Sequence, residues 1–160
     1  MKTTSFLKGL GYPVEEPKPG PEALYGVVWL ASRAQRQVAR TLRPFGLSPA
    51  KFNYLMIVKH VGGVEGLSQR EIAKRLLLNA GNVTHYLDGL EKRGWVVRAP
   101  GPDLRSHRIK ITTKGDHLLE RTWPAYRDAV KRLTDGLPEG SQRRLVELLG
   151  QWWEALEAES

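Results

Sequence analysis

The sequence predicts a mainly α-helical fold with one short β-hairpin. Over most of the 160 residues, apolar side chains recur every three or four positions, which places them on one face of a helix. Around residue 100 the pattern changes to two short segments separated by a Pro/Gly/Asp loop, as in a pair of neighbouring strands. The length suits one domain with a substantial core, and the longest apolar stretches are far too short to span a bilayer.

The composition indicates a globular protein with an excess of positive charge. Lysine and arginine together number 25 against 17 acidic residues, which gives a net charge of +8. Such a charge favours polyanionic partners, either nucleic acid or anionic lipid. Because the chain has no cysteine, it has no disulfides, no thiolate metal ligands and no thiol-based redox sensor. The first 20 residues lack the apolar segment of a secretory signal, so we expect a cytoplasmic protein.

The first segments are an arm and a long helix. Residues 1–20 are expected to form the arm, because three prolines and a glycine in its last eight residues oppose a regular element. Proline suits the first turn of a helix, so the helix is predicted to start at Pro21. Its apolar face continues to Leu42, with arginines on the other faces, and Pro44 and Gly46 end it.

Capping residues predict the next two helices. Ser48 is an N-cap ahead of Pro49, and this helix runs to the stop at Gly62. Ser68 and Glu71 form a capping box, in which each side chain accepts a hydrogen bond from the backbone amide of the other residue. The second helix is therefore predicted to be short, ending near residue 77.

Asn79 is predicted to cap a further helix across a tight turn. Its apolar stripe is Val83, Leu87 and Leu90, and Gly94 supplies the left-handed residue that ends it. The spacing of the stripe places Ala80, Gly81, Asn82, Thr84, His85 and Asp88 on or near the opposite face.

The hairpin and two helices complete the chain. Residues 95–98 and 107–112 are predicted strands, joined by the loop of residues 100–105. Thr112 or Thr113 then caps a helix in which Pro124 is expected to introduce a kink. The last helix starts around Pro138, and its apolar stripe is wide for a terminal helix: Leu145, Leu148, Leu149, Trp152 and Leu156.

A short helix, a tight turn, a second helix and a basic hairpin, in this order, are the elements of a winged helix-turn-helix. The second helix would enter the major groove, where Asn82 can pair with adenine and Thr84 or His85 can touch neighbouring bases. Ser68, Gln69 and Arg70 at the start of the first helix are assigned to the same interface. Phosphate-binding cations cluster in and beside the hairpin: Arg98, Arg105, Arg108, Lys110 and Lys114.

The segment Asp103-Leu104-Arg105-Ser106-His107-Arg108-Ile109-Lys110-Ile111-Thr112-Thr113-Lys114-Gly115 resembles the wing signature of MarR-type regulators. Its features are an acidic residue, a nearby arginine, alternating aliphatic residues, and Thr-x-x-Gly at the start of a helix. Residues 67–73 and 90–96 are also similar to that family, so the resemblance covers most of residues 21–157.

The resemblance implies a homodimer with interlocking N- and C-terminal helices that binds a pseudo-palindromic DNA operator. It implies that Arg105 enters the minor groove at the wing tip and that Asp103 helps to hold it. It also implies a repressor that leaves the DNA when a small aromatic or anionic effector binds. The effector would bind between the dimerisation and DNA-binding parts. Trp29, Arg33 and Phe52 are the residues assigned to that cleft.

The chain therefore divides into an arm (1–20), a dimerisation helix (21–47), a winged helix-turn-helix domain (48–116) and C-terminal dimerisation helices (117–160). The main interpretation is a transcriptional regulator that binds double-stranded DNA sequence-specifically and uses no cofactor. The alternative is a non-specific architectural or protein-interaction module with the same fold.

The same residues can also be explained without any contact to DNA. Asp103 and Arg105 would form a solvated turn if they did not contact DNA, and the hairpin cations would then be an ordinary charged surface. An enzyme is disfavoured, because the sequence has no Walker-type loop, dinucleotide glycine fingerprint, HExxH motif or nucleophile elbow. A metal site is disfavoured too, because no two of the four histidines have the i, i+4 spacing of a helical site.

Overall fold

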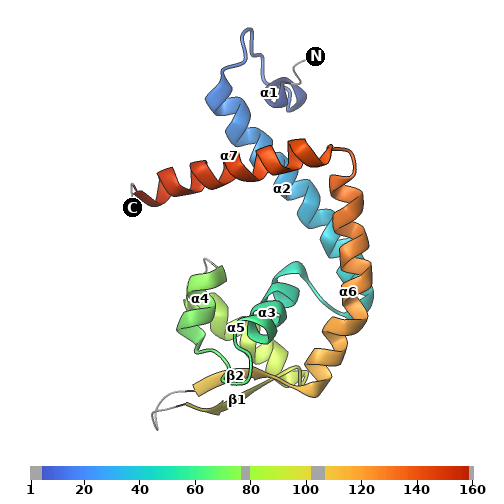
Figure 1. Cartoon of the computed structure of the whole chain (residues 1–160), viewed down its shortest axis with the longest axis vertical. Helices are drawn as coiled ribbons and strands as arrows, with labels where there is room; N and C mark the ends of the chain where they lie inside the picture. Colours follow the sequence, from blue (N-terminus) through green and yellow to red (C-terminus); the bar gives the residue numbers. More distant parts are fainter. Residues whose placement is uncertain (1–4, 77–79, 102–106, 159–160) are drawn as a thin grey trace.

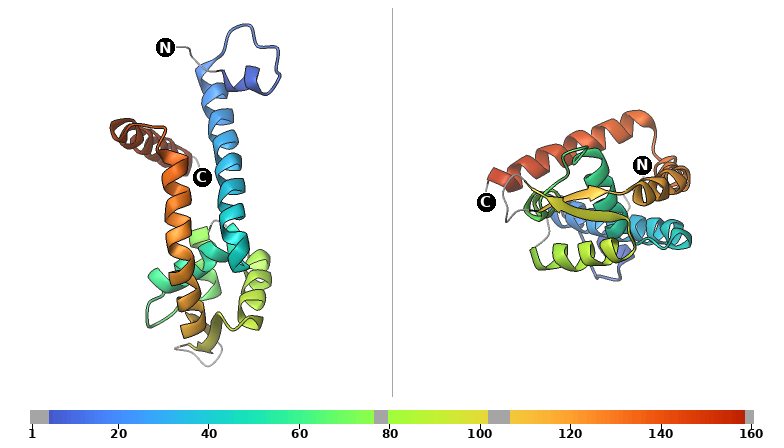
Figure 2. Two further views of the ribbon diagram at one scale, coloured as in Figure 1. Left: turned by 90° about the vertical axis from the view of Figure 1, so that its right-hand side faces the viewer. Right: turned by 90° about the horizontal axis from the view of Figure 1, so that it is seen from below.

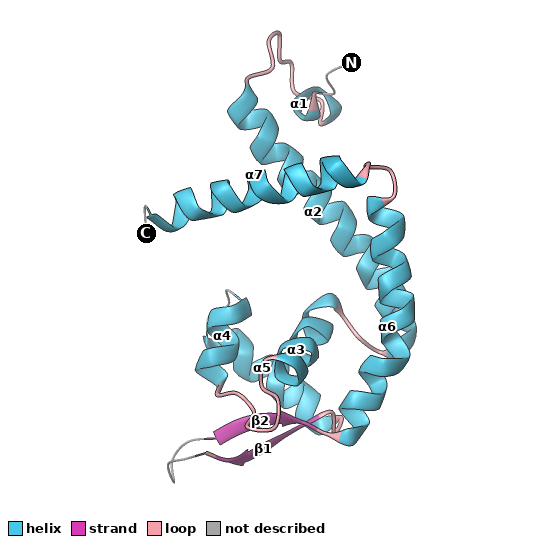
Figure 3. Ribbon diagram, in the orientation of Figure 1, coloured by secondary structure: helices cyan, strands magenta, loops and turns pink. Residues whose placement is uncertain are grey.

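The computed structural model describes residues 5–76, 80–101 and 107–158. Its elements are α1 (Phe6–Gly9), α2 (Pro19–Leu42), the short 3-10 helix η1 (Arg43–Phe45), α3 (Pro49–His60), α4 (Gln69–Leu76), α5 (Ala80–Lys92), β1 (Val96–Pro100), β2 (His107–Ile111), α6 (Thr113–Thr134) and α7 (Glu139–Ala158). Apart from α1 and η1, which were not predicted, they follow the predicted order. The predicted class, mainly α-helical with one β-hairpin, is confirmed (Figure 3).

The elements form a compact unit from which long helices extend. Helices α3, α4 and α5 lie together with the hairpin, at the bottom of Figure 1. Helices α2 and α6 run side by side away from this unit, and α7 turns off from the end of α6 (Figure 2). The three-helix unit with its hairpin has the arrangement of a winged helix-turn-helix.

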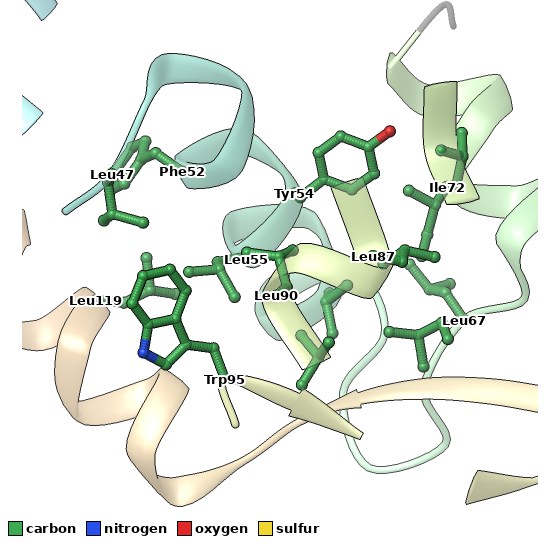
Figure 4. Close-up of a cluster of buried hydrophobic side chains, with 14 of the residues drawn as sticks. Leu47, Phe52, Tyr54, Leu55, Leu67, Ile72, Leu87, Leu90, Trp95 and Leu119 are labelled. Carbon is green, nitrogen blue, oxygen red and sulfur yellow. The ribbon is translucent and has the colours of Figure 1, made fainter. Parts of the chain in front are cut away.

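The core lies inside this compact unit (Figure 4). The predicted stripe of Val83, Leu87 and Leu90 on α5 is fully buried, which confirms its inward orientation. Ile109 of β2 is buried as well, and its backbone exchanges two hydrogen bonds with Leu67 just before α4. The hairpin is therefore attached to the helical unit through backbone bonds as well as side-chain packing.

The predicted helix caps are confirmed where the structure describes them. The Ser48 side chain accepts a hydrogen bond from the Lys51 amide at the start of α3. In the capping box, the Ser68 amide donates to Glu71 over 2.8 Å, and the Glu71 amide donates to the Ser68 hydroxyl over 3.2 Å. Of the two candidates for the cap of α6, Thr112 is the N-cap. The predicted cap Asn79 lies outside the described residues.

The N-terminal arm differs from the prediction, because part of it is helical and packs on α2. Glu22 accepts hydrogen bonds from the Ser5 hydroxyl and the Phe6 amide, both at 2.6 Å, and these bonds hold α1. Phe6 also packs edge-on to Trp29 and lies where a side chain at Gly26 would clash. The bonds join residues 16 and 17 positions apart, which local composition does not reveal. Helix α2 starts at Pro19, two residues earlier than predicted.

Two long helices expose large apolar side chains. On α2 these are Leu24, Tyr25, Val27, Val28, Trp29 and Leu30, and on α7 they are Leu145, Val146, Leu148, Leu149, Trp153 and Leu156. Among the described residues, none of the helices combines the length and hydropathy needed to cross a membrane. Apolar patches of this extent are typical of surfaces that another protein covers.

Candidate nucleic-acid interface

Helix α5 presents a polar face on the side opposite its buried stripe. Thr84 and His85 are exposed there, while Asp88 is half-buried. Ala80, Gly81 and Asn82 occupy the first turn of the helix, where the structure describes the backbone alone. The backbone therefore places the predicted base-reading segment at the start of the second helix of a helix-turn-helix, where such proteins contact base edges.

The start of α4 is ordered by the capping box. Gln69 is half-buried and Arg70 is exposed. The Ser68 hydroxyl is engaged within the chain, since it donates to Glu71 over 2.8 Å and accepts from the amide of that residue. Of the three residues assigned to DNA here, Arg70 has the most accessible side chain.

Glu71 also connects α4 to the wing. Arg108 of β2 donates to the Glu71 carboxylate over 2.7 Å, across 37 positions of the sequence. Hydrogen bonds from the amide and hydroxyl of Ser68, together with the charge of Arg108, lower the pKa of Glu71 below its ordinary value of 4.5. Arg108 is thus held against the helical unit.

Replacing Glu71 with glutamine is expected to reduce the acid sensitivity of the fold. A carboxylate with a lowered pKa in the folded state contributes stability above the ordinary value of 4.5, and this contribution is lost as the pH falls below it. Glutamine has no charge to lose, so the Tm of the variant should fall less than that of the wild type between about pH 5 and pH 3. Thermal unfolding followed by circular dichroism measures both slopes. The Glu65→Gln variant, on an exposed turn, is the control, and equal slopes for Glu71→Gln and the wild type would contradict the assignment.

Arg98 is the second wing cation with carboxylate partners. It bonds to Asp88 over 2.6 Å and also pairs with Glu91, both on α5. Hydrogen bonding to Asp88 and the two acidic charges raise the pKa of Arg98 further above its ordinary range. The pairing ties β1 to the recognition helix, so the positive charges of Arg98 and Arg108 are already matched within the chain.

The remaining wing residues divide between described and undescribed positions. Lys110 is half-buried in β2, and Lys114 is exposed in the first turn of α6. The strand register pairs Val96 with Ile111 and Pro100 with His107. Asp103 and Arg105 belong to the segment that connects these strands, and both lie outside the described residues.

Thr112 fastens the root of the wing to α6. Its hydroxyl donates to the Gly94 carbonyl over 2.7 Å and accepts from the Gly115 amide over 3.0 Å. Its own amide donates to the Trp95 carbonyl over 3.1 Å. One residue thus joins the end of the recognition-helix segment, the hairpin and α6. The sequence indicated the capping bond alone, because the bond to Gly94 spans 18 positions.

The structure does not bring Trp29, Arg33 and Phe52 together in one cavity of the described residues. Phe52 is buried in the core, where its ring lies 4.5 Å from that of Tyr126. Trp29 packs against Phe6 near the start of α2. Arg33 lines a cavity between α2 and α6, to which neither of the other two contributes.

A separate, largely apolar cavity lies between α3 and α6. Its volume is about 610 Å³, and its lining residues are Met56, Lys59, His60, Leu119, Glu120, Trp123 and Pro124. Helix α3 belongs to the helix-turn-helix, whereas α6 runs beside α2, so this cavity has the position expected of an effector cleft. In the described part of the chain, no group of histidine and acidic side chains is arranged to hold a metal ion.

Comparison with known proteins identifies the helix-turn-helix region as part of a known family. A model of the MarR family matches residues 45–106, which include α3, α4, α5 and β1. The uncharacterized HTH-type transcriptional regulator YkoM of Bacillus subtilis is 35% identical over 111 residues, covering 69% of this chain and 70% of the relative.

Solved structures agree over a longer stretch. A mutant of MarR from E. coli complexed with operator DNA superposes with a TM-score of 0.73 at 27% identity, covering 78% of this chain and 89% of the other. CouR from Rhodococcus jostii RHA1, bound to p-coumaroyl-CoA, gives a TM-score of 0.70 at 25% identity, with 78% and 87% covered.

Proposed function

The chain belongs to the MarR family, and from this premise we propose that it is a homodimeric, sequence-specific DNA-binding transcriptional regulator. We propose that it represses transcription until a small effector binds, and that it acts in the cytoplasm. The relatives are transcriptional regulators, and we propose no catalytic activity and no cofactor for this chain.

One observation carries the DNA-binding assignment: the polar face of α5 lies beside a basic hairpin that is braced against it. Arg98 connects β1 to α5, and Arg108 connects β2 to α4. These bonds hold the hairpin and the recognition helix as one surface, as a protein needs when it contacts a groove and the adjacent backbone together. In this assignment Arg98 and Arg108 position the wing, while Arg70, Lys110, Lys114 and Arg105 bind phosphate or the minor groove.

The exposed apolar faces of α2 and α7 support the dimer. A second copy of the chain would cover these faces, and we propose that residues 21–47 and 117–160 form the dimer around the winged helix-turn-helix of residues 48–116. In the described part of the arm, Ser5 and Phe6 pack on α2, and this part of the arm would lie next to the interface. Two recognition helices would then enter successive major grooves about 34 Å apart.

Binding to duplex DNA from the region upstream of its own gene tests the function. Fluorescence anisotropy against a scrambled duplex of equal length should show a preference of about 10³ or more at physiological salt. Equal affinity for both duplexes would instead support the architectural module. Absence of binding to either duplex would contradict the regulator and the architectural module, and would leave the protein-interaction module.

Arg105 and Asn82 should affect DNA binding in different ways. Arg105→Ala is expected to weaken binding to all duplexes and to reduce the slope of log affinity against log salt by about 1. Asn82→Ala should cost about 1–3 kcal/mol on the cognate operator and leave binding to scrambled DNA unchanged. Salt titrations of the two variants and the wild type measure these effects. If neither variant changes operator affinity, the contact assignment is wrong.

The cavity between α3 and α6 is the proposed effector site. Trp123 is half-exposed there, and its ring lies 5.6 Å from that of Tyr126, which packs on Phe52 in turn. Lys59 supplies a cation beside this aromatic surface. An aromatic molecule with one anionic group would match the lining, since aromatic rings pack on Trp and Met while a carboxylate bonds to lysine.

Lys59 connects this cavity to the root of the wing. Its ammonium pairs with Asp116 in the first turn of α6, next to Gly115. An anionic effector would compete with Asp116 for Lys59 and so loosen the contact between α3 and α6. The effector would then bind more tightly to an arrangement of the recognition helices that has lower operator affinity. By linkage, this difference in effector affinity releases the operator.

Trp123→Ala is expected to raise the concentration of an aromatic carboxylate needed for half-release of operator about tenfold or more, because it removes the aromatic surface of the cavity. Operator affinity without effector should not change. Benzoate and cinnamate are suitable probes, and Val64→Ala, on an exposed turn, is the control. If the variant and the wild type respond alike, the effector binds elsewhere.

A further inference from the structure

Four arginines line a second cavity, which lies between α2 and α6. Helix α2 contributes Arg33, Arg36, Gln37 and Arg40, and α6 contributes Arg132 and Leu133. The cavity volume is about 410 Å³, within the range of small-ligand sites. It shares no lining residue with the cavity between α3 and α6.

Helical spacing gathers the arginines of α2 on one face. Arg33 and Arg36 are three residues apart, and Arg36 and Arg40 are four apart, so their side chains are neighbours. Like charges at these spacings destabilise a helix. The neighbouring helix α6 runs beside this face (Figure 2) and adds a further positive charge at Arg132.

The four cavity arginines form no ion pair with any carboxylate in the part of the chain that the structure describes. Elsewhere in the described residues, Arg98, Arg108, Arg143 and Arg144 each pair with an acidic side chain, whereas others such as Arg43 and Arg127 do not. The cavity therefore holds several guanidinium groups whose repulsion no anion within these residues compensates.

We propose that this cavity binds a small molecule that carries several oxyanion groups, either phosphates or carboxylates. The planar guanidinium donates paired hydrogen bonds to just such groups, and four of them around one cavity match a multivalent anion better than a single carboxylate. Gln37 adds both a donor and an acceptor. No aromatic side chain lines the cavity, so recognition rests on charge and hydrogen bonds.

Binding there would connect the two long helices. An anion shared by Arg36 of α2 and Arg132 of α6 would replace repulsion between the helices with attraction. A ligand that binds the folded state alone also raises the Tm by mass action. The site would therefore respond to a charged metabolite independently of the aromatic effector site.

Isothermal titration calorimetry of the full chain at low salt tests the proposal, with tripolyphosphate and citrate as separate probes. The wild type should bind at least one of them, and the preferred probe identifies the oxyanion class. That probe should also raise the Tm by roughly 5 °C at hundredfold excess over Kd. Arg36→Gln/Arg132→Gln should weaken binding about tenfold or more. Arg33→Gln/Arg40→Gln should do the same.

The matched control is Arg43→Gln/Arg127→Gln, which removes the same two charges from exposed positions outside the cavity. This control should bind the probe within about twofold of the wild type. Equal weakening by the cavity and control variants would show binding to the general positive charge and overturn the proposal. So would failure of the wild type to bind either probe, as expected if carboxylates of a second copy fill the cavity.

Operator affinity separates this proposal from the proposed function. The cavity variants should bind the operator as the wild type does, because the cavity lies between α2 and α6, and these helices extend away from the compact unit that contains α5 (Figure 1). A parallel loss of operator and probe binding would assign the arginines to DNA phosphates and overturn the small-molecule site. A wild type that binds the probe but no operator would support the cavity and contradict the proposed function.

Discussion

Replacing Leu145 and Leu149 together with aspartate is expected to dissociate the protein into monomers. The two side chains are one helical turn apart on α7, and their exposed fractions are 43% and 39% in the single chain. Each buried leucine contributes about 2 kcal/mol, and a dimer would bury four of them. Aspartate at these positions also carries charge into an apolar contact. We therefore expect the dimer dissociation constant to rise by about 10³ or more.

Operator affinity should fall with the dimer. A monomer engages one half-site, whereas a dimer gains the second contact at high effective concentration, a difference of about 10²–10⁴ in affinity. Sedimentation velocity measures the oligomeric state, and anisotropy at the same protein concentration measures operator binding. Circular dichroism shows whether the variant keeps its helices.

Glu147→Gln is the control for the same helix. Glu147 lies two residues from each leucine, on the opposite face, and is exposed. This variant should remain dimeric and bind operator normally. If the double leucine variant stays dimeric, α7 does not form the interface. If it is monomeric but binds operator with wild-type affinity, the paired half-site arrangement is wrong.

Local sequence signals predicted the helical unit well, because they act within one or two turns. The stripe of Val83, Leu87 and Leu90 and the capping box of Ser68 and Glu71 each depend on residues three or four positions apart. Such spacings follow directly from helix geometry. The order of the elements and the basic hairpin followed from the same signals.

The interface charges were less predictable, because their partners are distant in the sequence. Arg98 pairs with Asp88 across 10 positions, and Arg108 pairs with Glu71 across 37. A charged residue in a strand gives no local sign of whether it faces solvent or a carboxylate. The assignment of Phe52 to an effector cleft came with the family resemblance, and no local feature of the sequence showed that its ring packs against Tyr126 in the core.

In the Thr-x-x-Gly motif at the start of α6, a tertiary contact requires the glycine. Thr112 is explained by its cap and by its bond to the Gly94 carbonyl, whereas Gly115 is required by the close approach of Trp95, just before β1. A Cβ at this position would lie 2.1 Å from the Trp95 carbonyl oxygen and 3.0 Å from Ile111 Cγ1. The left-handed conformation is not the reason, since Gly115 is not among the glycines with positive φ. The missing side chain provides space for the backbone of the wing root.

Gly115→Ala is accordingly expected to destabilise the fold by about 3 kcal/mol or more, because a backbone carbonyl cannot rotate aside as a side chain would. To accept the methyl group, α6 must move away from Trp95. That movement breaks the bond from the Thr112 amide to the Trp95 carbonyl and strains the bond from the Thr112 hydroxyl to Gly94. The Tm should fall by roughly 10 °C, measured by calorimetry on the dimer at fixed concentration.

Gly140→Ala is the matched control, since a Cβ there meets nothing within 4 Å and alanine favours a helix. Its Tm should equal or exceed that of the wild type.

The wing and α6 share the backbone contact at Gly115, so Gly115→Ala should also reduce operator affinity at temperatures where the protein remains folded. The bonds of Thr112 imply that the root of the wing is a rigid joint between the DNA-binding and dimerisation parts. If Gly115→Ala keeps the Tm and the operator affinity of the wild type, this joint is not rigid.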